Sequence, residues 1–249
     1  VHDNANVVWE TGDNRRIELP DMKEGSVAVY ELDEAFFPIY NVRCAGTQVP
    51  VFSLRSKTSF GVGDFGDLKK MVDWIALTQQ RVLQLLPIND TTTTHSWTDS
   101  YPYNSISIFA LHPQYVDLCA LPRIEDEALR KKFEDLRVEL NALPQIDYER
   151  VNKAKTEYLK ELYKQDGKTV LASAPFKKFF AEASSWLVPY AQYSYLREKY
   201  GTADFSKWPD HRQFNEAERS ALSGPRNVAF RNVAFYYYVQ FILNTQMAD

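Results

Sequence analysis

The segment Asp99-Ser-Tyr-Pro-Tyr-Asn-Ser105 combines the residue types that bind sugars. The flat apolar face of a pyranose packs on an aromatic ring, and neighbouring polar groups bond to its hydroxyls. Tyr101 and Tyr103 flank a proline whose fixed backbone should hold both rings rigidly, and Asn104 and Ser105 supply the polar partners. The alternative is that the two rings only pack beneath the loop.

Two tryptophans are further candidates for stacking on a sugar. Trp97 precedes the tyrosine segment, where it can serve either as a platform for a sugar or as an anchor of the loop. Near the N-terminus, Trp9 can stack on a glucose ring while Glu10 and Asn14 bond to its hydroxyls. The alternative is a Trp that covers a small core at the end of a strand, with Asn14 in a turn.

The carboxylates form no catalytic pair that the sequence reveals. Retaining glycosidases and transglycosylases need a nucleophile and an acid/base about 5–5.5 Å apart. None of the 33 acidic residues occupies a convincing context for this chemistry, and Asp64, Asp67 and Asp117 fit structural roles. We therefore expect no catalytic residue in this chain. No metal-ligand spacing is present either.

The glycine-rich segment 60–67 resembles a phosphate cradle only superficially. Its glycines do not follow the G-x-G-x-x-G spacing, and a Walker lysine is missing. We expect Gly61, Gly63 and Gly66 to form a tight turn in which Asp64 or Asp67 caps the following helix.

Composition narrows the class of protein. The net charge of −4 gives no global basic field for nucleic acid or an anionic membrane, and no apolar run is long enough to span a bilayer. Cys44 and Cys119 lie far apart and fit a reducing compartment, so we expect a cytoplasmic protein. The 249-residue chain begins without a signal peptide or an initiator Met, which indicates a piece of a longer protein.

The elements that must position these residues are of the α/β class. Short strands are expected over 7–9, 16–19 and 27–30, and parallel strands over 49–54 and 81–88 with a helix between them. In that helix Leu68, Met71, Val72, Ile75 and Ala76 form the apolar face. Helices are predicted over 125–140, 147–165, 174–200, 214–222 and 225–247. A tandem Arg-Asn-Val-Ala-Phe repeat occupies 226–235, and on a helix its two copies would face about 140° apart.

The order of three motifs resembles a known enzyme family. Ser59-Phe-Gly-Val-Gly-Asp-Phe-Gly-Asp-Leu68, Gln84-Leu-Leu-Pro-Ile88 and Ser100-Tyr-Pro-Tyr-Asn-Ser105 are similar to the first βαβ unit of 4-alpha-glucanotransferases, the amylomaltase or disproportionating-enzyme family (glycoside hydrolase family 77). In this family a Ser-Pro-Tyr-Gln-Ser segment contacts bound glucan, which implies substrate contacts for Tyr103 and Ser105. This chain departs from the pattern at Tyr101 and Asn104, where the family usually has Ser and Gln.

The resemblance extends to two more sites. His112 stands where the family commonly has Asn, which implies a possible contact with sugar. The segment Val8-Trp-Glu-Thr-Gly-Asp-Asn-Arg15 resembles the end of a family-20 starch-binding module, and its Trp9, Glu10 and Asn14 match binding positions of that module.

The resemblance implies a fold and a division of the chain. It implies the N-terminal part of a (β/α)8 TIM barrel with a large helical insertion, preceded by the last strands of a β-sandwich starch-binding module. The expected limits are 1–32 for the end of the starch-binding domain, 33–120 for the linker and first βαβ part of the barrel, and 121–249 for the helical insertion.

The implied activity is transfer of α-1,4-glucan segments between maltodextrins or to a glycan acceptor, with starch-like polysaccharide as partner and no cofactor. The resemblance also implies a retaining mechanism whose catalytic carboxylates lie beyond Asp249. Three alternatives stay open: a non-catalytic glucan-binding fragment, an α-amylase-type hydrolase, and a helical scaffold over 125–247 that binds a protein and no sugar. The oligomeric state is not specified by the sequence.

Overall fold

The computed structural model divides the chain into two compact units, residues 1–44 and 45–249. The residues it describes are 2–3, 6–7, 9–14, 16, 18, 20–29, 31, 44–212, 215–224 and 227–249. None of the described helices is both long and apolar enough to cross a membrane.

The first unit holds one short hairpin. Strand β1 (His2–Asp3) pairs antiparallel with β2 (Asn6–Val7). Gly12 and Gly25 adopt positive φ values of 113° and 81°, which favour glycine. The strands predicted over 16–19 and 27–30 are not found in the described parts of those segments. Val27 and Val29 are exposed there, so their alternation finds no sheet against which to pack.

The second unit begins with the predicted βαβ motif: strand β3 (Gly46–Val49), helix α1 (Phe65–Leu77) and strand β4 (Val82–Leu85). The two strands are parallel, with Gly46 opposite Val82 and Val49 opposite Leu85, which confirms the predicted pairing direction. The first strand was predicted to begin at Val49 and instead ends there. Pro50 explains the difference, because a residue without an N–H cannot continue a ladder.

Helix α1 begins as the glycine-rich segment predicts. Asp64 is the N-cap, and its carboxylate accepts the backbone N–H of Asp67 at 3.2 Å. A Cβ on Gly63 would lie 2.0 Å from the carbonyl oxygen of Val51, so only glycine fits. The predicted apolar face is correct for Leu68 and Ile75, which are buried, and wrong for Val72 and Ala76, which are exposed. The 3-10 helix η1 (Val51–Ser53) and strand β4 cover only part of this face of α1.

Five further helices follow, and all five lie where helical periodicity predicts them. Their bounds are α2 (Glu127–Asn141), α3 (Tyr148–Ala172), α4 (Ala174–Tyr200), α5 (Glu216–Ser223) and α6 (Phe230–Ala248). Short 3-10 helices are η1 (Val51–Ser53), η2 (Trp97–Ser100), η3 (Pro113–Tyr115), η4 (Leu118–Ala120) and η5 (Phe205–Lys207).

The tandem pentapeptide adopts two different structures. In the first copy residues 227–229 form a turn and Val228 is exposed, whereas the second copy lies in α6 with Val233, Ala234 and Phe235 buried. The prediction that both copies are helical is therefore wrong for residues 227–229, since α6 begins only at Phe230, the last residue of the first copy.

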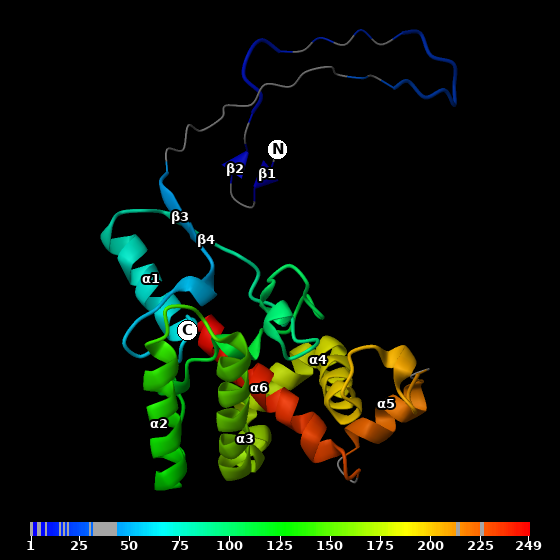
Figure 1. Cartoon of the computed structure of the whole chain (residues 1–249). Helices are drawn as coiled ribbons and strands as arrows, with labels where there is room; N and C mark the ends of the chain where they lie inside the picture. The colour runs from blue at the N-terminus through cyan, green and yellow to red at the C-terminus, as the bar shows by residue number, and fades with distance from the viewer. Residues whose placement is uncertain are drawn as a thin grey trace. The chain divides into compact units, whose positions relative to one another are not determined.

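Helix α6 organises the second unit. It packs on α3 and α4, and α2 packs on α3, as Figure 1 shows. One apolar core joins α1, α2, α3 and α6, and another joins α4 to α6. The C-terminal end of α6 reaches α1, where Lys69 Nζ lies 3.5 Å from the side-chain carboxylate of Asp249.

The connection between β4 and α2, residues 86–126, contains no helix longer than one turn and is partly buried. Lys155 of α3 is fully buried beneath it. Its ammonium donates to the carbonyl oxygens of Gln114 at 2.6 Å and Val116 at 2.8 Å, and it lies 3.7 Å from the Asp64 carboxylate. Burial lowers the pKa of Lys155 and raises that of Asp64 to about 6. Lys155 thus joins α3, the connection and the start of α1.

Lys155→Met should lower the free energy of unfolding by about 3–5 kcal/mol, because it leaves two buried carbonyls without donors and Asp64 without its closest cation. Urea unfolding followed by circular dichroism measures the change. Lys153→Met, at an exposed position of the same helix, is the matched control and should stay within about 0.5 kcal/mol of the parent. Equal effects of the two substitutions would contradict the role given to Lys155.

Candidate functional site

Five of the predicted sugar-binding residues lie on one closed loop, residues 89–111, called here the aromatic loop: Trp97, Tyr101, Tyr103, Asn104 and Ser105. Its ends are held together by an isolated antiparallel bridge between Asn89 and Leu111 and by the bond from Asp90 N–H to the carbonyl of Ala110, at 2.9 Å. Ile106 N–H returns to the carbonyl of Asp90 at 2.8 Å. The loop therefore leaves the body of the unit and returns to the same place.

Four aromatic rings on this loop are open to solvent: those of Trp97, Tyr101, Tyr103 and Phe109, of which Phe109 stacks on Trp186. The exposed fractions are 70% for Trp97, 61% for Tyr101 and 60% for Tyr103. The two tyrosine rings are neighbours, with centroids 5.5 Å apart and planes inclined by 55°. Neither tyrosine packs beneath the loop, so the alternative left open by the sequence does not apply. Asn104 beside them is exposed and Ser105 is half-buried.

Asp99 determines the shape of the loop around these rings. Its buried carboxylate accepts the backbone N–H groups of Thr93, Thr94 and His95 at 2.7–3.1 Å and the hydroxyls of both threonines at 2.7 and 2.9 Å. Burial opposes the charged form, but these hydrogen bonds outweigh it and lower the pKa of Asp99. Residues 93–95, which precede the tyrosine segment, are thus held in place by hydrogen bonds to the Asp99 carboxylate.

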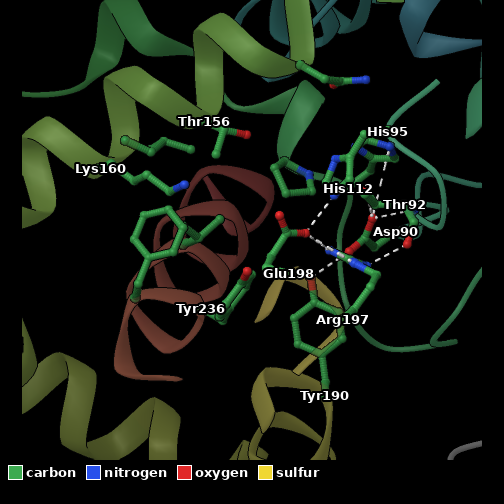
Figure 2. Close-up of a pocket in the computed structure, with 15 residues that line it drawn as sticks. Asp90, Thr92, His95, His112, Thr156, Lys160, Tyr190, Arg197, Glu198 and Tyr236 are labelled. Atoms are coloured by element: carbon green, nitrogen blue, oxygen red, sulfur yellow. Dashed lines mark hydrogen bonds and ion pairs between the residues drawn. The ribbon is translucent and has the colours of Figure 1, made fainter. Parts of the chain in front are cut away.

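A second buried carboxylate, Asp90, ties the aromatic loop to helix α4 (Figure 2). It accepts the hydroxyl of Tyr190 at 2.6 Å and both the hydroxyl and the backbone N–H of Thr92, at 2.6 and 2.9 Å. Arg197, also on α4, donates to the carbonyl of Thr92 at 2.5 Å and to Glu198 at 3.1 Å. Glu198 in turn lies 2.6 Å from His95 Nε2. Helix α4 therefore holds the loop through the neutral hydroxyl of Tyr190 and the charged side chains of Arg197 and Glu198.

His112 lies in the interior behind the loop, apart from the exposed rings. It is 3% exposed, its Nδ1 accepts the backbone N–H of Gln114 at 3.1 Å, and its Nε2 lies 4.0 Å from Asp90 Oδ1. Burial lowers the pKa of His112, against the opposing effect of Asp90, so the imidazole is neutral at pH 7 with its proton on Nε2. His112 also lines a small cavity of about 60 Å³, which can hold a few waters.

The remaining candidates belong to the first unit. Trp9 and Asn14 are exposed there and Glu10 is half-buried. Within the described residues no group of three or more His, Cys, Asp or Glu side chains could hold a metal ion.

Sequence reasoning missed the residues that support the loop. Asp90, Tyr190, Arg197 and Glu198 were not singled out, and Asp99 was noted only as the first residue of its motif. Tyr190 is 100 positions from Asp90, and Arg197 is 105 positions from Thr92. Charged and polar residues on a mostly apolar helix such as α4 were the one available signal, because buried polar groups need partners.

The unit thus combines a parallel βαβ start, a helical body and a supported loop with exposed aromatic rings, an arrangement found in carbohydrate-active α/β enzymes. The sequence pattern of the 4-alpha-glucanotransferases, glycoside hydrolase family 77, matches residues 49–249. The chain belongs to this family.

Individual relatives agree with this assignment. The chain is 37% identical to 4-alpha-glucanotransferase DPE2 of Oryza sativa subsp. japonica over 83% of its length, and 32% identical to a 4-alpha-glucanotransferase of Chlamydia muridarum over 81%. It spans only 22% and 37% of the lengths of these two proteins.

Solved structures show that the fold is shared. Amylomaltase from Streptococcus agalactiae, in complex with acarbose, superposes with a TM-score of 0.63 at 22% identity, and amylomaltase from Corynebacterium glutamicum with 0.58 at 18%. Each comparison covers 82% of this chain, and 39% and 27% of the respective amylomaltases.

Asp99→Asn should lower the free energy of unfolding by about 2 kcal/mol at pH 7, because an amide offers one acceptor where the carboxylate offers two. The folded-state pKa of Asp99 is lowered, so its stabilisation is present above pH 3.8 and is lost as the pH falls through the still lower folded value. The variant should lack this loss.

Urea unfolding at pH 7 and near pH 3 measures both effects, and hydrogen exchange should become faster at the amides of 93–95. Asp73→Asn, at an exposed position on α1, is the control. Unchanged protection of 93–95 in Asp99→Asn would show that the carboxylate does not organise the loop.

Proposed function

We propose that residues 45–249 form a glucan-binding part of a 4-alpha-glucanotransferase. The observation that carries this proposal is the exposed group Trp97, Tyr101 and Tyr103 on a loop fixed from within by Asp99 and Asp90. Fixed aromatic rings bind a sugar without the cost of ordering the loop at the moment of binding. Membership of the family supports α-1,4-glucan, maltodextrin or a starch-like polysaccharide as the ligand.

The roles of the individual residues follow from their chemistry. Tyr101, Tyr103 and Trp97 offer ring faces to successive glucose units, and Asn104 and Ser105 bond to sugar hydroxyls. His112 supports the binding surface from behind the loop, where its Nε2 faces the carboxylate of Asp90. No cofactor is needed for this binding.

The reaction is transfer of a glucan segment between maltodextrins or to a glycan acceptor. A carboxylate nucleophile attacks the anomeric carbon while an acid protonates the leaving oxygen; an acceptor hydroxyl then attacks the glycosyl-enzyme and gives its proton to the same residue. The four buried aspartates described here, Asp64, Asp67, Asp90 and Asp99, all bond to nearby donors of the fold. We therefore place the catalytic carboxylates in the length of the relatives that this chain does not span.

The finer architecture belongs to the same proposal. Strands β3 and β4 serve as the first two strands of a (β/α)8 barrel, residues 33–120 as the linker and first βαβ part, and residues 121–249 as a helical insertion. Residues 1–32 serve as the end of a starch-binding module that uses Trp9, Glu10 and Asn14. The free thiols of Cys44 and Cys119 fit a cytoplasmic enzyme.

Two alternatives make different predictions. A non-catalytic glucan-binding protein would bind maltodextrin in the same way, with the whole parent protein unable to transfer glucan. A helical scaffold would have no affinity for sugar. The match to the 4-alpha-glucanotransferase family disfavours an α-amylase-type hydrolase.

Tyr103→Ala and Tyr101→Ala should each weaken binding of maltoheptaose about threefold to tenfold, because each removes one stacking surface worth about 0.5–1.5 kcal/mol. Isothermal titration calorimetry measures the dissociation constants. Phe205→Ala removes an equally exposed ring on η5 and is the control. A loss of affinity in the control as large as in the tyrosine variants would argue against the aromatic loop as the binding surface.

Incubation with maltotriose tests where the catalytic groups lie. The 249-residue chain should release neither glucose nor longer dextrins, whereas the whole parent enzyme should produce both. Chromatography of the products with pulsed amperometric detection distinguishes the outcomes. A dextrin ladder made by the 249-residue chain would place the nucleophile and the acid/base within it.

A further inference from the structure

A groove of about 620 Å³ lies between helices α3, α4 and α6, within the size range of small-molecule sites. Its rim carries cations from all three helices: Lys160 and Lys164 from α3, Lys199 from α4 and Arg231 from α6. Its wall contains aromatic rings, including those of Tyr195 and Tyr236. The groove thus combines positive charge with flat apolar surface.

The positive charge of this groove is only partly neutralised by the protein. Two carboxylates also line it, but Glu161 pairs with Lys164 at 2.7 Å, and Glu198 pairs with Arg197 at 3.1 Å and with His95 at 2.6 Å. In the described part of the chain no carboxylate lies within 4 Å of the charged groups of Lys160, Lys199 or Arg231. Three cations without a carboxylate partner among the described residues therefore line one groove of a protein whose net charge is −4, and the ammonium of Lys199 also lies 4.9 Å from the ring centroid of Tyr200.

Local geometry orients one cation and adds to the positive potential. The ammonium of Lys160 lies 6.0 Å from the ring centroid of Phe235 in the groove wall, which holds this side chain at the groove. Arg231 and Asn232 belong to the first turn of α6, where the helix dipole adds positive potential.

Another large groove, between α2 and the η4 region, has a similar volume of about 600 Å³ and also carries cations. Two of its arginines are matched by acids on the same helix, at 3.7 Å for Arg130 with Glu127 and 2.6 Å for Arg137 with Glu134. Its wall is less aromatic, with Phe60, Phe133 and Tyr158 as its only rings among the described residues.

We propose that the groove between α3, α4 and α6 binds a phosphorylated sugar. The phosphate dianion lies among Lys160, Lys199 and Arg231, and the pyranose lies against the aromatic wall. The phosphate follows from the charges alone, whereas the choice of a sugar rests on the proposed function. Lys160, Glu198 and Tyr236 also line the cavity behind the aromatic loop, so the bound ligand would lie next to the helix that holds this loop.

Calorimetric titration with glucose 6-phosphate, glucose and inorganic phosphate tests the proposal. Glucose 6-phosphate should bind most tightly, and its affinity should fall as salt is added. Lys160→Gln combined with Lys199→Gln should weaken binding roughly tenfold or more, because two charge-assisted contacts are lost. Lys153→Gln combined with Lys178→Gln makes the same change in charge at exposed positions of α3 and α4 outside the groove and should have no comparable effect.

Each other outcome overturns part or all of the proposal. No binding of glucose 6-phosphate, or an equal loss of affinity in both double variants, would show that the groove is not a binding site. Equal affinity for inorganic phosphate would show that the sugar is not recognised, and equal affinity for glucose would show that the phosphate is not recognised. These readings come from heats of binding and use no transfer reaction, so they are independent of the maltotriose assay that tests the glucanotransferase activity.

Discussion

A buried loop must have partners for its backbone polar groups, and the second unit is arranged around this requirement. The connection from β4 to α2 satisfies only part of its own N–H and C=O groups because it lacks long helices and strands. Side chains of α6 do so: Gln240 accepts from Leu111 N–H and donates to the carbonyl of the same residue, and Gln246 makes the same pair of bonds with Asp117. Each glutamine amide therefore supplies one acceptor and one donor to the backbone, as a neighbouring strand would.

This arrangement explains why the helical body and the aromatic loop form one unit. The bonds from Gln240 and Gln246 each span 129 residues, so the loop is shaped only when α6 has docked. Lys155 and Arg197 give α3 and α4 the same function through charged donors. An unpaired buried polar group costs about 1–3 kcal/mol, which makes each of these contacts specific for one arrangement. The exposed rings therefore rest on a support that is rigid before any ligand arrives.

The sequence predicted what depends on neighbouring residues. Periodicity gave all five later helices, and Asp64 was one of two caps proposed for α1. It failed where distant contacts decide. The same Arg-Asn-Val-Ala-Phe string forms a turn in 227–229 and helix in 231–235, where Val233, Ala234 and Phe235 are buried against α3 and α4 whereas Val228 is exposed. For the site, Tyr101 and Tyr103 were evident from a local motif, whereas Tyr190 and Arg197 were not.

The buried carboxylates Asp90 and Asp99 of this chain support the fold and are not arranged for catalysis. A general acid or a nucleophile must keep an accessible oxygen and respond to the substrate. Asp99 instead accepts five protein groups, and both oxygens of Asp90 are bonded within the fold. Protonating either would release a section of the loop, so these acids serve best when they remain charged and unreactive. In the proposed function such a region presents the substrate, because catalysis requires carboxylates with different surroundings.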